Sequence, residues 1–308
     1  MTEVLKTILP VVLMLAVGVL CRRKQMISRE GINALKNVAV NITLPAVLLN
    51  AFATTQYALS DLLIPLLMFL VCVAAWALGR AAGRLFGKRA RFVPFLTTGF
   101  EAGMLGYALF GMLYGAEHTA EFARIDLGQV LFVFTLYKIL LGWDGRQKTS
   151  AGQLVKDMAA SPIILAIAAG VLLGATGLYE RMKPSGISGI FDTCVSFVSA
   201  PTSVLILLTI GYDLVLDDIP WKETSRVVVL RLAIMLLLRF VLLWLLRVLC
   251  PSVHLTEAVN LMFLMPPPFV LTVFADDGDQ RTYISSALSV STLVAVLGFA
   301  LIAAFGIS

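Results

Sequence analysis

The sequence predicts an all-α polytopic membrane protein of about ten transmembrane helices. The first observation is composition: 59% of the 308 residues are hydrophobic and 14% are charged, and the mean hydropathy is +0.92. Soluble proteins are nearer half apolar and a quarter charged, so this composition excludes that class. At about 20 residues per spanning helix, ten spans and short loops use the whole length. We therefore expect no separate soluble domain.

The second observation is a run of three prolines, Pro266, Pro267 and Pro268, inside the apolar stretch 261–275. Proline has no backbone N–H and clashes with the carbonyl four residues earlier, so three in a row end an α-helix. Lipid cannot satisfy the backbone groups that such a break exposes, so the break must lie within protein or beside a wet cavity. Broken helices of this kind bind substrate in secondary transporters.

The third observation is the spacing of apolar runs, which gives five helices in each half. In the first half they cover 5–21, 32–54, 62–83, 92–114 and 125–143. The first run is no cleavable signal peptide, because Arg22, Arg23 and Lys24 follow it. The second carries Asn41 and Pro45. In the second half the expected helices cover 158–178, 187–212, 227–249, 256–275 and 283–305.

Basic residues predict the orientation. They cluster after the first, third and fifth helices: Arg22, Arg23, Lys24, Arg29 and Lys36; Arg80, Arg84, Lys88, Arg89 and Arg91; Arg146, Lys148 and Lys156. By the positive-inside rule these loops are cytoplasmic, so we expect a multi-pass protein of the cell membrane with both termini outside. The net charge of +5 therefore reflects topology, and we expect no nucleic-acid partner.

An odd number of helices per half means that the second half enters the membrane inverted. We expect repeats at 1–150 and 151–308, with Pro10 matching Pro162 and Pro45 matching Pro201. The fourth helix is then the counterpart of the ninth. Its centre, 99–106, holds three glycines and a carboxylate, so the sequence predicts a second break near Gly103–Gly106 that crosses the first.

Several segments together are similar to a known family. They are Asn37–Ala46 with Pro45, Pro201 followed by Ile210-Gly211, Met265-Pro266-Pro267 with Val273-Phe274-Ala275, and Ser286–Thr292. The chain resembles the auxin efflux carrier family of membrane transporters, which includes plant auxin exporters and bacterial malonate and malate permeases. The similarity covers nearly the whole chain, and the proline-rich ninth helix is its most specific motif.

The resemblance implies crossed broken helices 4 and 9 and a homodimer formed through helices 2 and 7. It also implies a scaffold of helices 1, 2, 6 and 7 against a mobile unit of helices 3–5 and 8–10. Two positions depart from the family pattern. Glu101 stands where members usually have asparagine, and Ala108 stands where they have proline. A carboxylate therefore replaces an amide that would bind a substrate carboxylate.

The candidate substrate and coupling residues lie at or near the two breaks. They are Glu101, Gly103, Met104, Gly106, Asn41, Pro45, Pro266, Pro267, Pro268, Phe269 and Arg239. A carboxylate at membrane depth is costly when charged and tends to be functional. We expect Glu101 to couple transport to a proton or to coordinate substrate; the alternative is a structural pair with Arg239.

Other polar residues in the spans have competing interpretations. Arg239 falls near mid-membrane, where it pairs with an anionic substrate or makes a structural salt bridge, whereas we expect Arg231 to snorkel to the cytoplasmic side. Asn41 either lines a cavity or bonds neighbouring helices. His118 and His254 fall in expected loops, and the four cysteines form no disulfide or metal motif.

These observations predict a transporter of a small organic anion that uses alternating access, with a proton as coupling ion and no cofactor. The first alternative is a sodium-coupled symporter of the bile-acid-transporter type. The second is an intramembrane protease, because Tyr212-Asp213 and Gly278-Asp279 match fragments of an aspartyl protease pair. The second fragment lacks the required upstream glycine, which disfavours the protease.

Overall fold

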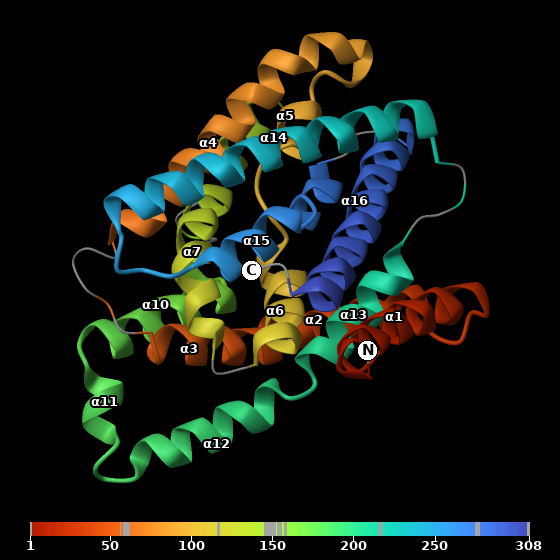
Figure 1. The fold of residues 1–308 in the computed structure, drawn as a ribbon. Helices are drawn as coiled ribbons and strands as arrows, with labels where there is room; N and C mark the ends of the chain where they lie inside the picture. Colours follow the sequence, from red (N-terminus) through yellow and green to blue (C-terminus); the bar gives the residue numbers. More distant parts are fainter. Residues whose placement is uncertain are drawn as a thin grey trace.

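The computed structural model describes residues 2–55, 57, 62–115, 118–144, 152, 156, 159–214, 217, 219–274 and 278–306. In this part of the chain every regular element is helical and no strand occurs. The helices pack as a bundle in which α14 crosses one face and α12 lies at the periphery (Figure 1). The prediction of an all-α membrane protein is confirmed.

The elements of the first half follow the expected spans, with additional breaks. They are α1 (Thr2–Arg23), α2 (Arg29–Val38), η1 (Ala39–Thr43), α3 (Leu44–Ala53), α4 (Leu63–Gly83), η3 (Arg84–Arg89), α5 (Val93–Leu96), η4 (Ala102–Gly106), α6 (Tyr107–Tyr114), α7 (Thr119–Phe132), η6 (Val133–Tyr137) and α8 (Lys138–Asp144). The η1 segment is π-helical and ends just before Pro45. Wider π turns are a known way to accommodate a backbone that cannot continue the α-helical hydrogen bonds.

The second half contains α10 (Pro162–Ala175), α11 (Leu178–Met182), α12 (Ile187–Ser199), α13 (Thr202–Asp213), α14 (Trp221–Leu249), α15 (Thr256–Leu264), η7 (Phe269–Phe274) and α16 (Gly278–Phe305). The expected seventh helix is divided at Pro201, which stands between α12 and α13. Proline ends α12 there because its ring clashes with the carbonyl four residues earlier and it has no N–H to donate.

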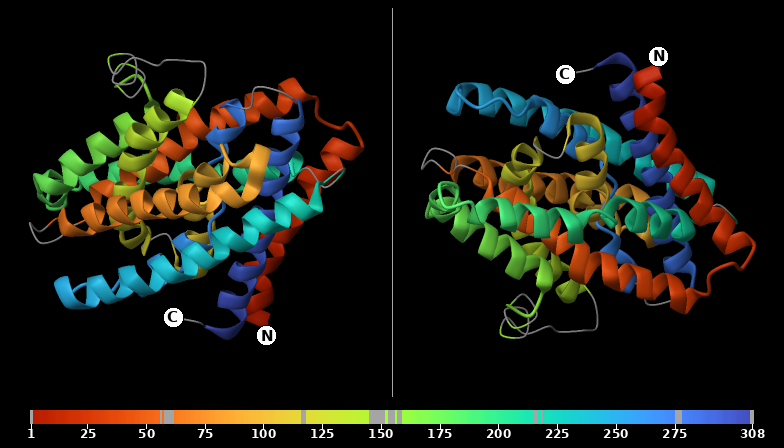
Figure 2. Two further views of the ribbon diagram at one scale, coloured as in Figure 1. Left: turned by 90° about the horizontal axis from the view of Figure 1, so that it is seen from above. Right: turned by 90° about the horizontal axis from the view of Figure 1, so that it is seen from below.

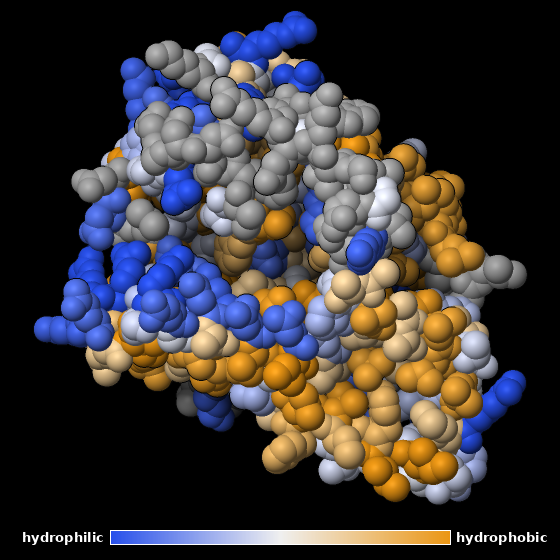
Figure 3. Space-filling view, turned by 180° about the vertical axis from the view of Figure 1, so that it is seen from behind, coloured by the Kyte–Doolittle hydropathy of each residue, from blue (hydrophilic) through white to orange (hydrophobic). Residues whose placement is uncertain are grey.

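Within the described residues, seven helical stretches are long and apolar enough to cross a membrane. Two shorter apolar stretches, Ala102–Tyr114 and Pro162–Ala175, add to them. Large apolar side chains are exposed along α1, α4, α14 and α16, as expected of surfaces that face lipid. Figure 3 shows hydrophobic residues gathered over a broad part of one face, with hydrophilic residues in a band beside it.

Two helix pairs make close backbone contacts through glycine. A Cβ on Gly18 of α1 would lie 2.3 Å from the carbonyl oxygen of Leu208 on α13, and one on Gly211 of α13 would lie 2.3 Å from that of Leu15. In the second pair, a Cβ on Gly170 of α10 would lie 2.7 Å from Phe52 Cβ on α3. Small residues permit such close approach between membrane helices. In the numbering of the ten expected spans, α1 with α13 joins helix 1 to helix 7, and α3 with α10 joins helix 2 to helix 6.

The remaining helices form a second packed group. The helix α4 packs on α7, α5 and α14, while α14 also contacts α15 and α16. Gly128 of α7 again permits close approach, because a Cβ there would lie 2.1 Å from Pro65 O on α4. Contacts between the groups include α1 with α16, which lie side by side in Figure 2, and α13 with η4.

Helices 4 and 9 are both interrupted. The ninth is broken at 265–268, between α15 and η7, as the prolines predict. The fourth is broken at 97–101, between α5 and η4. The prediction of a break at Gly103–Gly106 is wrong, because those residues lie within the π-helical η4. At the centre of the interruption Gly99 has a φ of +67°, a conformation that glycine adopts without strain.

Candidate functional site

The two breaks are joined directly to each other through Glu101. Its backbone N–H donates to the carbonyl of Pro266 at 2.8 Å. Its side chain accepts one bond from the N–H of Phe269 (Oε2, 2.7 Å) and one from the N–H of Met104 (Oε1, 3.4 Å). The carboxylate therefore satisfies N–H groups at the starts of both η4 and η7, which the breaks leave without helical partners.

Arg231 of α14 binds backbone carbonyl groups at both breaks. Its guanidinium donates to the carbonyls of Leu96 (3.1 Å), Gly99 (2.8 Å) and Met265 (2.8 Å), and it lies over the ring of Phe100. Only 4% of the residue is exposed. A buried cation is tolerated when its donors are used, and carbonyls freed at helix ends are favourable partners for it. The prediction that Arg231 snorkels to the cytoplasmic side is wrong.

Gly99 and Pro268 bring the two breaks into van der Waals contact. A Cβ on Gly99 would lie 2.8 Å from Cγ of Pro268, closer than real Cβ atoms come to any neighbour. Both residues are buried. Glycine at 99 is therefore required twice, once for its positive φ and once for the space that the proline ring occupies.

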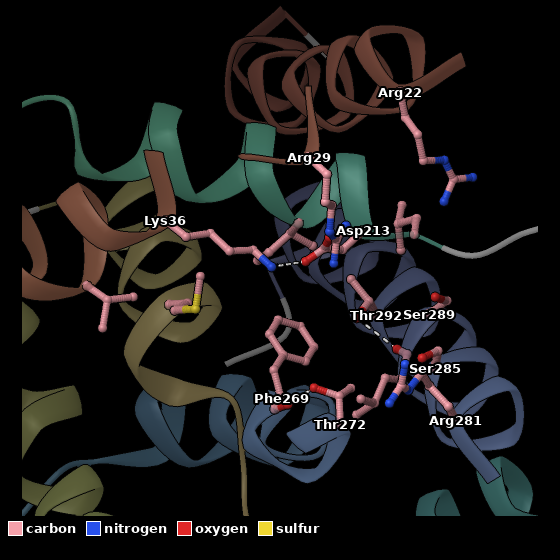
Figure 4. Close-up of a pocket in the computed structure, with 15 residues that line it drawn as sticks. Arg22, Arg29, Lys36, Asp213, Phe269, Thr272, Arg281, Ser285, Ser289 and Thr292 are labelled. Carbon is pink, nitrogen blue, oxygen red and sulfur yellow. Dashed lines mark hydrogen bonds and ion pairs between the residues drawn. The ribbon is translucent and has the colours of Figure 1, made fainter. Parts of the chain in front are cut away.

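A cavity of about 440 Å³ lies beside this crossing (Figure 4). It is lined on one side by α1, α2, η1 and α13 and on the other by η4, η7 and α16. Its lining residues are Arg22, Arg29, Lys36, Val40, Met104, Ile210, Asp213, Leu214, Phe269, Thr272, Arg281, Ser285, Leu288, Ser289 and Thr292. Met104 and Phe269, whose N–H groups bind Glu101, belong to this lining.

The cavity is strongly basic, and Asp213 is the single acidic residue among those that line it. Asp213 binds Arg29 at 2.7 Å and also pairs with Lys36. These side chains reach toward one another from α2 and α13 (Figure 4). Four basic side chains facing one carboxylate, together with three hydroxyls on α16, form a surface suited to an anion.

Some of the predicted site residues lie together at the cavity and at the crossing of the two breaks. Glu101, Met104, Phe269 and the three prolines lie together there. Gly103 and Gly106 lie on η4 immediately beyond, where Gly106 leaves room for the ring of Phe122.

Helix 2 contributes Lys36 and Val40 to the lining instead of Asn41 and Pro45. Asn41 is exposed and Pro45 is half-buried, and neither lines the cavity.

Arg239 lies apart from the cavity and its Nε donates to Oδ1 of Asn260 on α15 at 2.7 Å. The predicted structural pair of Glu101 with Arg239 is therefore wrong. Asp213, weighed as part of a protease pair, is held by Arg29 and Lys36. The side chain of Asp279 lies outside the described residues.

Sequence reasoning missed the basic residues that line the cavity, and it missed the role of Arg231, which binds carbonyls of both breaks. Arg22, Arg29 and Lys36 were explained as a topology signal, which removed the reason to place them in a site. The signal for two of them was that Arg29 and Lys36 are seven residues apart on one helix and therefore share a face. Asp126 of α7 was also missed, although a carboxylate in an apolar run is itself a signal.

The long apolar helices and the two joined breaks define a polytopic membrane protein with two interrupted helices that meet inside the bundle. Residues 3–303 match the family model described as "Membrane transport protein". The chain belongs to this family, and the resemblance to auxin efflux carriers is thereby confirmed. An uncharacterized transporter of Methanocaldococcus jannaschii is 24% identical over 216 residues, which cover 67% of this chain and 68% of that protein.

Proposed function

We propose that the protein is a secondary transporter that moves a small organic anion across the membrane by alternating access. The observation that carries this proposal is the basic cavity between two helix groups, whose wall includes both broken helices. Membership of the transport family supports a transporter and disfavours an enzyme. A small carboxylate suits the lining, because Arg and Lys donors can take its charge and the α16 hydroxyls can bind its other oxygens.

The moving parts in this proposal are the two packed groups. Helices 1, 2, 6 and 7 form a scaffold through their glycine contacts, and helices 3–5 and 8–10 form the transport unit. Because the cavity has walls from both groups, a shift of the transport unit changes which side of the membrane the cavity faces. The pairing of helix 1 with 7 and of helix 6 with 2 is the relation expected of two inverted repeats, 1–150 and 151–308.

The positive-inside rule places the termini outside and the Arg22–Lys36 end of the cavity toward the cytoplasm. Assembly as a homodimer through helices 2 and 7 is part of the proposal. It is supported by apolar side chains exposed along α12, among them Ile187, Ile190 and Phe197.

Glu101 is the residue proposed to couple binding of the anion to binding of a proton. In the structure its carboxylate occupies the N–H groups of Met104 and Phe269, where a substrate carboxylate would also be stabilised. Two carboxylates at one place repel each other, so an anion binds more readily when Glu101 is protonated. A protonated Glu101 binds these N–H groups more weakly and releases them, and the proton and anion then move together.

Uptake of radiolabelled small mono- and dicarboxylates into proteoliposomes tests the substrate class. Lys36→Gln removes one cation from the cavity and should lower the apparent affinity for the transported anion at least about tenfold, equivalent to about 1.4 kcal/mol. Lys183→Gln is the matched control, because Lys183 is an exposed residue of the segment after α11 and pairs with Glu180. Equal transport by both variants, or uptake of no carboxylate by the wild type, would contradict the proposal.

The same vesicles test this role of Glu101. With an imposed proton gradient, Glu101→Gln should no longer accumulate substrate against its gradient, while exchange of internal for external substrate persists. Glutamine keeps one acceptor oxygen for the two N–H groups but cannot carry a proton. Accumulation by Glu101→Gln at the wild-type level would remove Glu101 from proton coupling.

A further inference from the structure

A second buried carboxyl, Asp126, lies away from the cavity in the middle of the transport unit. It is 1% exposed, on α7, and its Oδ1 accepts a hydrogen bond from Gln129 Nε2 at 3.1 Å. The hydroxyl of Tyr107 on α6 lies beside the carboxyl. Neither Asp126 nor its partners line the basic cavity.

Three oxygens of this cluster are buried without a hydrogen-bond partner: Asp126 Oδ2, Gln129 Oε1 and the Tyr107 hydroxyl. Glu101 differs in this respect, because each of its carboxylate oxygens accepts a backbone N–H. Nearly all buried polar atoms in proteins are paired, so these oxygens, which belong to side chains that neighbour Asp126, require a further hydrogen-bond donor. An ionised carboxylate in this position would also be costly.

The groups that act on the Asp126 carboxyl are Gln129, Tyr107 and Glu101, and none of these is a cation. Arg124, two residues earlier on α7, acts on Tyr57. The titratable groups that face the cluster from packed elements are Cys72 on α4, Tyr107 on α6, Glu101 before η4, and Tyr57 between α3 and α4. The cation of α4, Arg80, lies in the last turn of that helix over the ring of Trp76.

The remaining elements against α7 add no positive charge either. The helix α3 and the η6 segment contain no charged residue. On α15 the one charged residue is Glu257, which acts on Tyr114. The described surroundings of Asp126 therefore supply two hydrogen-bonding side chains, Gln129 and Tyr107, and one like charge, Glu101.

One proton adds a hydrogen-bond donor to the cluster. With Asp126 ionised, the Tyr107 hydroxyl can donate to Asp126 Oδ2, and Gln129 Oε1 stays without a partner. With a proton on Oδ2, Asp126 can donate to Tyr107, which leaves the hydroxyl hydrogen of Tyr107 for another acceptor. A water molecule would supply hydrogens but would leave the negative charge uncompensated in an apolar interior.

We infer that Asp126, Gln129 and Tyr107 form a proton-binding site, separate from Glu101, in which Asp126 holds the proton. Its use in coupling rests on the proposed function; the proton site itself does not. Asp126 and Glu101 repel each other when both are charged. A proton on Asp126 therefore favours negative charge at the crossing, either on Glu101 or on a bound anion.

Infrared spectroscopy of the full chain in phosphatidylcholine–phosphatidylglycerol vesicles tests the site directly. A protonated carboxylic acid has a carbonyl stretch distinct from that of a carboxylate. We expect this band near neutral pH in the wild type and its disappearance in Asp126→Asn. Asp192→Asn is the matched control, since Asp192 is a partly buried carboxyl of α12 that accepts bonds from Tyr179. That variant and Glu101→Gln should keep the band.

Tyr107→Phe gives an independent readout if Asp126→Asn fails to fold. The band frequency depends on the hydrogen bond that the acid donates, so losing the hydroxyl should shift it only if the acid is Asp126. Stability should also depend on pH: because the fold favours neutral Asp126, the melting temperature of the wild type should fall as pH rises through the titration of the band. Asp126→Asn should lack this fall.

Three results would overturn the inference. A band lost in Glu101→Gln and kept in Asp126→Asn assigns the proton to Glu101 and leaves the proposed function intact. A wild type without any band near neutral pH shows that Asp126 is ionised. A band abolished by sodium chloride, but not by choline chloride at the same ionic strength, makes the cluster a sodium site. Failure of carboxylate uptake affects the proposed function alone, because the spectra need no substrate.

Discussion

The breaks in helices 4 and 9 meet at the same point but are produced by different chemistry. In helix 9 three prolines forbid the helix wherever the chain is placed. In helix 4 residues 97–101 contain no proline, and the break depends on Gly99 and on contacts from elsewhere in the chain. Arg231 and Glu101 bind backbone groups of both breaks. The break in helix 9 is therefore fixed by its own sequence, whereas the break in helix 4 depends on tertiary contacts.

The largest effect is expected from Arg231→Met, which removes the group common to both breaks. Three buried carbonyls lose their donor, and orphaned buried groups cost about 1–3 kcal/mol each, so we expect a loss of about 3–5 kcal/mol in the free energy of unfolding. Thermal unfolding of the purified protein measures it. Arg239→Met is the control, because Arg239 donates to one side chain, Asn260, lies over the ring of Phe240 and binds no group of either break. Equal losses would show that Arg231 does not hold the breaks.

An intermediate effect is expected from Gly99→Ala. The added Cβ meets the Pro268 ring at 2.8 Å and also strains a φ of +67°, for a combined cost of about 2–4 kcal/mol. Gly177→Ala separates the two causes, since Gly177 has a φ of +66° and nothing within 4 Å of a Cβ. Its cost should be about 1 kcal/mol. If both variants melted alike, the contact between the breaks would carry no energy.

The smallest effect is expected from Pro267→Ala. Its two neighbouring prolines still exclude a helix, so the break persists and the change in unfolding free energy should stay within about 1 kcal/mol. Transport by this variant should resemble that of the wild type. A large loss of stability would mean that helix 9, like helix 4, depends on contacts at each residue.

The same contrast explains what could be predicted from the sequence. The break at 265–268 was placed correctly because proline acts locally. The break in helix 4 was misplaced because Gly99, Gly103 and Gly106 look alike in sequence, whereas only Gly99 has a positive φ. Gly106 instead leaves room for the ring of Phe122, and a Cβ on Gly103 would make only an ordinary contact with Leu44. No local sequence pattern distinguishes a glycine that forms a turn from one that makes room for a neighbouring side chain.

Arg231 and the cavity were beyond local reasoning for a related reason. The carbonyls that bind Arg231 come from residues 96, 99 and 265, so its role depends on chain segments that meet only after folding. The basic residues of α1 and α2 served equally well as topology signals. Composition and apolar spacing settle the fold class, because burial in lipid acts on each span separately.

The backbone contact between α1 and α13 has a consequence for measuring motion. Gly18 and Gly211 set each helix against the carbonyl oxygens of the other, so neither helix can slide along its partner without collision. The pair is therefore a natural fixed reference frame. A spectroscopic probe at the exposed Val204 of α13, read against a second probe on α14, reports displacement of α14 alone.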